Sequence, residues 1–323
     1  MKKTTVVIPN YNGIAYLEDC LRFLKRSQEA EFDTIVVDNG STDGSTRLVK
    51  EQFPWVRLIE LQENTGFSHA VNVGIKESKT PYVLLLNNDT VVEHDFVAKL
   101  EQAMDDNPSY FSFSSKMLCM KQPEVIDDAG DYYCALGWAF ARGKGKSAER
   151  FTAATDVFAA CAGAAIYRRE VFREIGYFDE LHFAYLEDID VGYRARLRGY
   201  KNGYCPKAVV YHAGSGFSGS RYNEFKVNLS SRNSIYLIYK NMPLLQILLN
   251  LPFLLAGFGV KILFFIKKKM GYIYIRGLWR GIVLSCSAKA RRKKFPFRAA
   301  YFSAYVKVQL ELWYNMLRRV TEG

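Results

Sequence analysis

Residues 34–45 have the sequence TIVVDNGSTDGS, in which an apolar run changes abruptly into a run of small and polar residues. Thr34–Val37 predicts a short buried strand, because β-branched residues favour strands. The residues after it are typical of a loop, and Asp43–Gln52 predicts a helix. A buried strand followed at once by a polar loop and a helix is the building unit of α/β sheets. The fold therefore depends on whether this unit recurs.

The same unit occurs four times between residues 5 and 104. The predicted strands are Thr5–Pro9, Thr34–Val37, Val56–Glu60 and Tyr82–Leu86, and the predicted helices are Tyr16–Lys25, Asp43–Gln52, Phe67–Glu77 and His94–Met104. Apolar strands that alternate with helices imply a mostly parallel sheet with helices on both of its faces. We therefore expect an α/β fold with a Rossmann-like sheet, and ligands at the carboxyl ends of its strands.

After residue 106 the pattern of strands and helices becomes mixed. The predicted strands are Tyr110–Met117, Tyr132–Phe140, Val157–Tyr167 and Ala208–His212, and the predicted helices are Arg168–Ile175, Leu186–Arg198 and Tyr222–Tyr239. Near residues 230–240 the composition changes to a basic and apolar one. We therefore predict a globular domain at 1–234 and a helical tail at 235–323.

Charge is distributed unevenly along the 323 residues. The formal net charge is +11, with +15 on residues 231–323 and −4 on residues 1–230. A nucleic-acid-binding domain carries its basic residues on the folded surface rather than in a Leu- and Phe-rich tail, so we expect no nucleic acid partner. The six cysteines are scattered, and the first apolar run is ended by Pro9 and Asn10. We therefore expect a reduced, intracellular protein without a signal peptide.

The predicted tail has an apolar part and a basic part. Asn241–Val260 contains no charged residue, and clusters of Lys and Arg follow at 267–269 and 291–294. A single membrane span would separate these clusters from a cytoplasmic globular domain, although clustered basic residues favour the cytoplasmic side. A re-entrant hairpin or in-plane amphipathic helices avoid this conflict. We predict a basic amphipathic tail on the anionic inner face of the plasma membrane; a true span and a buried or oligomerising tail are the alternatives.

Polar residues stand where the first two predicted strands end. Pro9, Asn10 and Tyr11 precede an Asn-Gly pair, which on its own indicates a turn. Asp38 could accept a hydrogen bond from a nucleobase or a ribose, or could serve as the N-cap of the next helix. The sequence contains neither GxGxxG nor GxxxxGK[ST], so it does not support a dinucleotide fold or a P-loop.

The fourth strand ends in Asn87-Asn88-Asp89. Asp89 could hold Mg²⁺ or Mn²⁺, which prefer oxygen ligands and often bridge carboxylates to substrate phosphates. The two asparagines could hydrogen-bond a ligand without repelling its phosphates. His212 ends a later strand and opens a Gly/Ser loop, which makes it a candidate metal ligand or phosphate contact.

Three acids stand at the start of a predicted helix: Glu187, Asp188 and Asp190. Acidic residues at this position interact favourably with the helix dipole, which is sufficient to explain them. One of them could instead be a general base, with its pKa raised by burial or by a neighbouring acid. The spacing leaves open which of the three has that role.

Seven segments carry a resemblance to a known family. They are VVIPNYN (6–12), VVDNGSTDGS (36–45), ENTGFSHAVNVGI (63–75), LLLNNDT (84–90), AGAAIYRREVFREIGYFDE (162–180), YLEDIDVGYRARLRGY (185–200) and VVYH (209–212). In this order they resemble the family 2 glycosyltransferases with the GT-A fold, over about residues 4–217. The subgroup that they resemble is the bacterial rhamnosyltransferase-like enzymes, which build cell-surface polysaccharide.

The resemblance implies an inverting transfer of a sugar from a nucleotide-diphosphate donor, such as dTDP-rhamnose or a UDP-sugar, to a hydroxyl of a glycan. It implies a polyprenyl-linked acceptor and a divalent metal, Mg²⁺ or Mn²⁺, as cofactor. Residues 1–234 are then the catalytic domain. A metal neutralises the charge of the departing diphosphate, and one positioned base suffices on the acceptor side.

The resemblance also implies roles for single residues. Asp188 matches the catalytic base, and Glu187 is expected to orient the acceptor. Asp89 and His212 match metal ligands, although only the last acid of the family's Asp-x-Asp motif is present here. The expected donor-binding residues are Pro9, Asn10, Tyr11, Asp38, Asn39, Asn64, Gly66, Asn87 and Asn88, with Asp38 on the nucleobase.

Two other functions fit parts of the sequence. A nucleotidyltransferase has a similar sheet, but its first strand is followed by a glycine-rich loop and a basic residue, where this chain has Asn10-Tyr11-Asn12-Gly13. A non-catalytic nucleotide-sugar-binding or scaffold protein would explain the incomplete Asp-x-Asp motif. The presence of Asp89, Asp188 and His212 favours the transferase.

Overall fold

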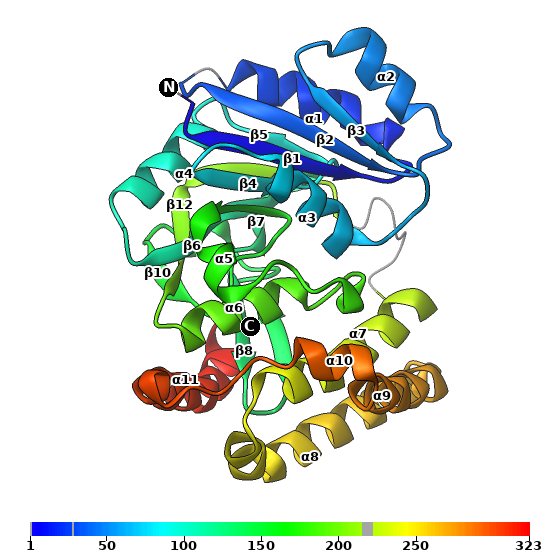
Figure 1. Ribbon diagram of the computed structural model, residues 1–323, viewed down its shortest axis with the longest axis vertical. Helices are drawn as coiled ribbons and strands as arrows, with labels where there is room; N and C mark the ends of the chain where they lie inside the picture. Colours follow the sequence, from blue (N-terminus) through cyan, green and yellow to red (C-terminus); the bar gives the residue numbers. More distant parts are fainter. Residues whose placement is uncertain (1, 28, 215–221) are drawn as a thin grey trace.

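The computed structural model describes residues 2–27, 29–214 and 222–323. Its centre is a ten-stranded sheet with the order β10-β12-β6-β11-β4-β1-β2-β3, in which β5 also pairs with β12 and β7 with β6 (Figure 1). β8 and β9 form a separate hairpin. The strands are β1 (Thr4–Asn10), β2 (Phe32–Asn39), β3 (Arg57–Leu61), β4 (Tyr82–Leu86), β5 (Thr90–Val92), β6 (Tyr110–Cys119), β7 (Gln122–Asp128), β8 (Asp131–Cys134), β9 (Trp138–Ala141), β10 (Thr155–Val157), β11 (Ala164–Arg168) and β12 (Lys201–His212).

Helices cover both faces of this sheet and extend beyond it. They are α1 (Ile14–Arg26), α2 (Ser45–Gln52), α3 (Phe67–Glu77), α4 (Phe96–Asp105), α5 (Phe172–Ile175), α6 (Glu187–Leu197), α7 (Glu224–Asn241), α8 (Leu244–Lys267), α9 (Gly271–Ser285), α10 (Ala288–Lys293) and α11 (Phe302–Thr321). All four helices predicted before residue 106 are present, and their ends differ from the predicted ones by a few residues.

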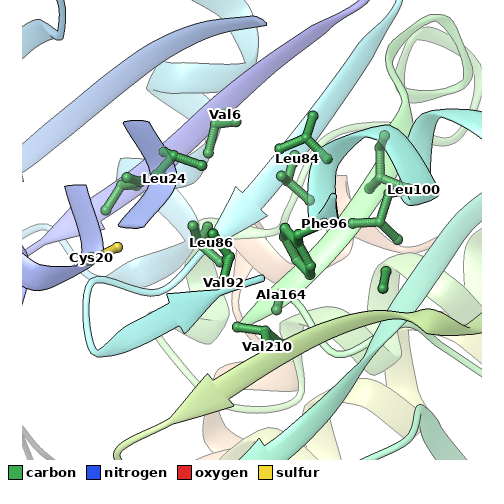
Figure 2. Close-up of a cluster of buried hydrophobic side chains, with 14 of the residues drawn as sticks. Val6, Cys20, Leu24, Leu84, Leu86, Val92, Phe96, Leu100, Ala164 and Val210 are labelled. Carbon is green, nitrogen blue, oxygen red and sulfur yellow. The ribbon is translucent and has the colours of Figure 1, made fainter. Parts of the chain in front are cut away.

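The strands β1 to β4 form the parallel half of the sheet. β1 pairs in parallel with β2 and with β4, and β2 pairs in parallel with β3. Because side chains alternate between the two faces of a strand, Val6 and Ile8 belong to a core cluster with residues of α1 and α4, whereas Val7 packs with residues of α3. Figure 2 shows Val6 in the first cluster. The predicted α/β fold with helices on both faces is confirmed.

The other half of the sheet brings later segments to the same edge. β11 runs antiparallel between β4 and β6, and β12 runs parallel to β6. At the end of β12, His212 pairs in register with Cys119 of β6 and with Thr90 of β5. The end of the last strand therefore lies beside the loop that follows β4.

Two predicted strands are wrong in their extent. Tyr132–Phe140 is a hairpin of β8 and β9, because the chain reverses around Gly137, which has a φ of +71°. Val157–Tyr167 contains two strands that pair in different parts of the sheet, β10 with β12 and β11 with β4 and β6. An apolar run by itself does not show where a chain turns back.

The helices after residue 222 continue the body of the protein. α7 runs through residue 234 without a break, so the predicted division there, which stays a prediction, falls inside a helix. α11 returns to the body, where Ala135 N donates to Leu312 O at 3.0 Å. Helices α8 to α11 gather at the end of the molecule opposite α1 and α2 (Figure 1).

The helix α8 has the length and composition of a membrane span. It has 24 residues, and its most apolar window of 18 residues has a mean hydropathy of 2.0 and is 17% buried. Among the described residues it is the one helix that meets these criteria. Length and composition do not distinguish a helix that crosses a bilayer from one that lies along its surface.

Gly74 allows α3 to lie directly against β1. A Cβ atom at this position would lie 2.2 Å from Val7 Cγ1. We expect Gly74→Ala to lower the free energy of unfolding by about 1–3 kcal/mol, because the added methyl group overpacks the core. Urea unfolding followed by circular dichroism measures this change.

The matched control is Gly259→Ala in α8, where an added Cβ meets no atom within 4 Å. This substitution is expected to leave stability unchanged or to raise it by up to about 1 kcal/mol, since Ala favours a helix over Gly. Equal effects of the two substitutions would contradict the close packing of α3 on β1.

Candidate active site

A hydrogen-bond network joins the carboxyl ends of β1, β2 and β4. Asn10 Nδ2 donates to Asp38 Oδ1 at 2.8 Å and to Ser45 Oγ at 2.9 Å. Asn88 Nδ2 donates to Asn10 Oδ1 at 2.7 Å. Asn10 and Asp38 are both buried, which makes these bonds costly to lose. The network fixes three predicted donor-binding residues relative to one another.

The hydrogen-bond partners of Asp38 in this network are groups of the protein itself. Asp38 Oδ2 accepts a hydrogen bond from Ser41 N at 2.9 Å, so both of its carboxylate oxygens have partners, and the residue is 2% exposed. It is not the N-cap of α2, because that position is taken by Gly44. The structure thus makes Asp38 the support of the turn after β2.

Asn39 joins the end of β2 to a second loop of the predicted donor cleft. Asn39 Nδ2 donates to Asn64 Oδ1 at 3.1 Å and to Gly66 O at 3.2 Å. Gly66 has a φ of +89°, and a Cβ there would lie 2.6 Å from Phe183 Cδ2. Ser68 N donates to Phe183 O at 3.1 Å. The loop at 64–66 therefore touches the segment that leads to Glu187 and Asp188.

The other predicted donor-binding residues lie at the same edge of the sheet. Pro9 pairs with Val37 inside the sheet, and Tyr11 follows directly after β1; both residues are partly buried. Asn87 N donates to Gly163 O at 2.8 Å. The structure therefore brings together residues that are up to 79 positions apart in the sequence, from Pro9 to Asn88.

Asp89 and His212 face each other, as the metal hypothesis requires. His212 Nε2 lies 3.3 Å from Asp89 Oδ1, and His212 Nδ1 lies 2.7 Å from Asp127 Oδ2. Burial alone would lower the pKa of His212, but its hydrogen bonds with Asp127 and Asp89 raise it to about 9. Lys144 Nζ forms a further ion pair with Asp127 at 2.6 Å.

This arrangement fits a divalent cation. Each ring nitrogen of His212 faces a carboxylate, so the site already favours positive charge. Imidazole nitrogen and carboxylate oxygen are donors that suit Mn²⁺ or Mg²⁺ together with phosphate oxygens. Asp127 fixes the orientation of the ring, as an outer carboxylate commonly does for a histidine ligand. Asp89 and His212 could therefore hold the ion.

The three acids at the start of α6 have different surroundings in the structure. Asp190 is fully buried and forms ion pairs with Arg194 Nη2 and Lys240 Nζ, both at 2.8 Å. Burial alone would raise the pKa of Asp190, but these two positive charges hold it well below its ordinary range. Asn241 Nδ2 donates to the remaining oxygen at 2.8 Å. Asp190 is therefore a structural carboxylate and not the base.

Glu187 and Asp188 have no such cationic partner among the described residues. Burial raises the pKa of Asp188 to about 6, although backbone hydrogen bonds from Ile189 and Ala162 act in the opposite direction. Ile189 N lies 2.7 Å from Asp188 Oδ1. Burial and the charge of Asp188 raise the pKa of Glu187 well above its ordinary value, and Glu187 Oε2 lacks a partner within the described residues.

Further acids that the sequence analysis did not single out lie beside this pair. Asp128, Asp131 and Cys161 each place a ligand atom within 4.8 Å of the others. Burial raises the pKa of Asp128 to about 7, and burial with the charges of Asp128 and Asp188 raises that of Asp131 well above its ordinary value. Burial also raises the pKa of the Cys161 thiol. A metal ion would have to displace protons from these groups, as it would from His212, so Asp128, Asp131 and Cys161 form a second group of side chains that could hold an ion.

A signal for the missed acids was present in the sequence. Residues 126–131 read IDDAGD, with three acids around a glycine that ends an apolar run. In the structure Gly130 has a φ of +93° and Gly130 N donates to Asp128 Oδ1 at 2.7 Å. Asp127 then faces His212 while Asp128 and Asp131 face the acids of α6.

Comparison with known proteins decides the family. The model of "Glycosyl transferase family 2" matches residues 5–176. The chain belongs to this family. The matched region includes β1 to β4, the network around Asn10 and Asp38, and the proposed metal ligand Asp89. The resemblance inferred from the seven segments is therefore confirmed at the level of the family, and the rhamnosyltransferase-like subgroup stays a prediction.

Two of the curated relatives are a polymerase and a synthase of staphylococci. The chain is 37% identical over 93 residues to a teichoic acid poly(glycerol phosphate) polymerase of Staphylococcus epidermidis, covering 28% of this chain and 13% of that one. It is 23% identical over 210 residues to a poly-beta-1,6-N-acetyl-D-glucosamine synthase of Staphylococcus aureus, covering 64% and 49%. The chain thus spans half or less of the length of these relatives.

A solved structure supports the fold over nearly the whole chain. The mannosyltransferase PcManGT from Pyrobaculum calidifontis, in complex with GDP-Man and Mn²⁺, aligns with a TM-score of 0.53 and 17% identity. The alignment covers 95% of this chain and 87% of that one. At this identity the similarity shows the GT-A-like fold that family 2 membership and the sheet topology also indicate.

The ion pair between His212 and Asp127 leads to a prediction about metal affinity. We expect Asp127→Asn to weaken Mn²⁺ binding about 10- to 100-fold, because the carboxylate no longer holds the His212 ring toward Asp89. Calorimetric titration with Mn²⁺ in the presence of UDP measures the affinity.

Asp105→Asn is the matched control for this titration, since Asp105 is paired with Lys3 and Tyr82 on the outer side of α4. It should bind Mn²⁺ as the unaltered protein does. Unchanged affinity in Asp127→Asn would contradict the role of Asp127 in holding the His212 ring toward Asp89.

Proposed function

We propose that this chain is an inverting glycosyltransferase that moves a sugar from a nucleotide-diphosphate donor to a hydroxyl of an acceptor. The observation that carries the proposal is the position of Asp188 at the start of α6, with a pKa raised to about 6 and no cationic partner among the described residues. Its neighbour Asp190 is neutralised by Arg194 and Lys240. Glu187 has its pKa raised well above the ordinary value and favours its protonated form, so Asp188 is the better proton acceptor of the remaining two acids.

Asp188 is proposed to be the general base. With a pKa of about 6 the carboxylate is mostly ionised near pH 7 and can take the proton of the attacking acceptor hydroxyl. The hydrogen bond from Ile189 N fixes one oxygen of the carboxylate at 2.7 Å. The buried Glu187 beside it is expected to orient the acceptor, since its Oε2 lacks a protein partner in the described residues. A direct displacement with one base and no covalent intermediate inverts the configuration of the transferred sugar.

Asp89 and His212 are proposed to hold a divalent ion, Mg²⁺ or Mn²⁺. When bound, the ion supplies neutralising charge for the departing nucleoside diphosphate. Residues of the chain at this edge of the sheet position the loops that surround the donor. Asn10, Asn88 and Asn39 hold the loops after β1, β4 and β2 in a fixed arrangement around the predicted donor cleft.

The donor is proposed to be a nucleotide sugar, with dTDP-rhamnose and UDP-sugars as the first candidates. The rhamnosyltransferase-like resemblance supports the first, and the bound GDP-Man of the mannosyltransferase neighbour adds GDP-sugars to the test. The surface-polymer enzymes among the relatives support a role in polysaccharide synthesis. Neither relative is covered over its full length, so the identities of the donor and the acceptor have to be measured.

The acceptor is proposed to be a polyprenyl-linked glycan that approaches along α9. A cavity of about 410 Å³ lies beside Phe183, just before the catalytic pair, and is also lined by Phe225, Arg232 and Arg280. Guanidinium groups favour phosphate, and the aromatic rings offer apolar contact. Arg280 belongs to α9, whose other side exposes Trp279. An acceptor with an anionic link and an apolar tail matches both surfaces.

The exposed apolar side chains of α8 and α9, called here the α8–α9 surface, are proposed to lie on the cytoplasmic face of a membrane. Those more than half exposed include Leu244, Leu245, Leu255, Leu263, Tyr272 and Trp279. The exposed lysines 267–269 follow α8 at its end. Apolar area beside clustered positive charge is the combination that binds an anionic bilayer, which is the proposed occupant of this surface.

Turnover of a donor tests the proposed function. Purified protein is incubated with dTDP-, UDP- and GDP-sugars, with Mn²⁺, Mg²⁺ or EDTA, and release of nucleoside diphosphate is measured. We expect metal-dependent turnover of one donor, and a loss of about 10²–10⁴-fold in Asp188→Asn, because the amide cannot act as a base. The rate should fall as pH drops through about 6, since protonation of Asp188 removes the base.

Nucleotide binding separates the possible failures of this experiment. Asp188→Asn should bind the nucleoside diphosphate with unchanged affinity. A protein that binds nucleotide but stays silent with every donor, also when polyprenyl-phosphate-linked acceptors are added, is the scaffold protein of the alternative interpretation. A protein that binds no nucleotide excludes the transferase.

Membrane attachment is tested with vesicles of phosphatidylglycerol and the full chain. We expect replacement of lysines 267–269 by Gln to weaken co-sedimentation about 10²-fold, from about 1 kcal/mol for each basic residue at an anionic surface. The matched control replaces Lys25, Lys50 and Lys79, three exposed lysines of the α1–α3 region, and should bind like the unaltered protein. Equal loss in both triple variants, or no binding by the unaltered protein, would disprove attachment through this surface.

A further inference from the structure

The segment that leads into α6 has an unusual backbone. Phe183, Tyr185 and Leu186 have φ values of +65°, +69° and +67°. Side chains of this size rarely adopt positive φ, because the Cβ atom crowds the following carbonyl. The segment 183–186 ends directly at Glu187 and Asp188, so its conformation sets the direction in which these carboxyl groups leave the helix. Three neighbouring exceptions persist only if other parts of the fold hold them.

Asn233 in the middle of α7 supplies that hold. Its Nδ2 lies 2.9 Å from His182 O, 2.9 Å from Ala184 O and 2.7 Å from Tyr185 O. The two N–H bonds of one amide group are thus shared among three carbonyls of a loop about 50 residues away in the sequence. Asn233 is fully buried, so water cannot replace it as the donor.

Arg232 locks the orientation of this amide. Its Nε and Nη2 donate to Asn233 Oδ1 at 2.9 and 2.8 Å, which fixes which end of the side chain faces the loop. Arg232 Nη2 also lies 2.8 Å from Leu181 O and from His182 O. The acceptor side of Asn233 is therefore satisfied within α7, and its donor side is available only to the loop.

α7 is itself fixed by close contact with α9. Added Cβ atoms at Gly277 and Gly281 would lie 1.8 Å from Ser231 Oγ and 2.5 Å from Arg232 O, so the two helices touch at Asn233's own level. α9 carries part of the α8–α9 surface. Asn233 thus stands between the catalytic segment on one side and the proposed membrane-contacting helices on the other.

We infer that Asn233 is a positioning residue, which holds segment 183–186 in its conformation, with positive φ at Phe183, Tyr185 and Leu186, so that Glu187 and Asp188 face the acceptor. This inference rests on the proposed function for its catalytic consequence, but the structural hold is independent of it. Asn233 touches neither donor nor acceptor in this scheme. Its loss should leave nucleotide binding intact and disturb the catalytic step.

The test uses the full chain with Asn233→Ala and, in case that variant folds poorly, Asn233→Ser, which keeps one donor. Ser234→Ala is the matched control, because Ser234 is buried on the same helix and its Oγ donates to Ser230 O within α7. Amide hydrogen exchange over residues 181–190 measures the hold. Calorimetry with UDP, GDP and dTDP in Mn²⁺ measures nucleotide binding, and the donor assay measures kcat and KM.

We expect faster exchange across 181–190 in both Asn233 variants and not in Ser234→Ala. We expect kcat to fall about 10²-fold in Asn233→Ala, less in Asn233→Ser, with nucleotide affinity unchanged, since a misplaced reacting group costs about this much. Unchanged exchange, or an unchanged kcat despite faster exchange, overturns the inference. A loss of nucleotide affinity equal to the loss of kcat also overturns it. If the unaltered protein turns over no donor, the proposed function fails, and exchange alone decides whether Asn233 holds the segment.

Discussion

The parallel register of β1, β2 and β4 is the constraint on which the rest of the structure depends. It brings the carboxyl ends of three strands to one edge, where Asn10, Asp38 and Asn88 bond to one another. A shift of one residue in any of these strands would turn the polar ends toward the wrong face and break this network. β11 and β12 then extend the same sheet, so that His212 and the segment at 161–163 reach the same edge from much later in the chain.

Burial divides the carboxylates at this edge into two kinds. Asp190 and Asp127 have close cationic partners, Lys240 and Lys144 among them, and keep their charge at a low pKa. Glu187, Asp188, Asp128 and Asp131 have raised pKa values, because burial outweighs the charge of Lys144 near Asp128 and Asp131 and meets no cation at Glu187 and Asp188. Groups of the first kind hold the protein together. Within the second kind, Asp188 with a pKa of about 6 and Asp128 with a pKa of about 7 can exchange protons near neutral pH, which is what acid–base chemistry needs.

The helices after residue 222 serve the active site as well as the proposed membrane contact. α7 supplies Lys240 to Asp190 and Asn233 to the segment before Glu187. α11 packs near β8, where Asn315 Nδ2 donates to Tyr133 O at 2.9 Å. A tail that could be removed without effect on the catalytic part would not make these buried bonds. The basic and apolar composition of this region therefore describes its outer surface and not its inner one.

The sequence by itself determined the α/β class, the first four strand–helix units and the polar residues at their ends, because these depend on local periodicity and on short turns. It also determined the family, because the seven short segments and their order are visible in the sequence itself. Only the tertiary structure showed that Tyr132–Phe140 is a hairpin, that Asp190 is structural, and that Asp127 faces His212. Two of these depend on contacts between residues far apart in the chain. Asp190 keeps its charge through Arg194, four residues away, and also through a lysine 50 positions away, and spacing along the sequence carries no record of that second contact.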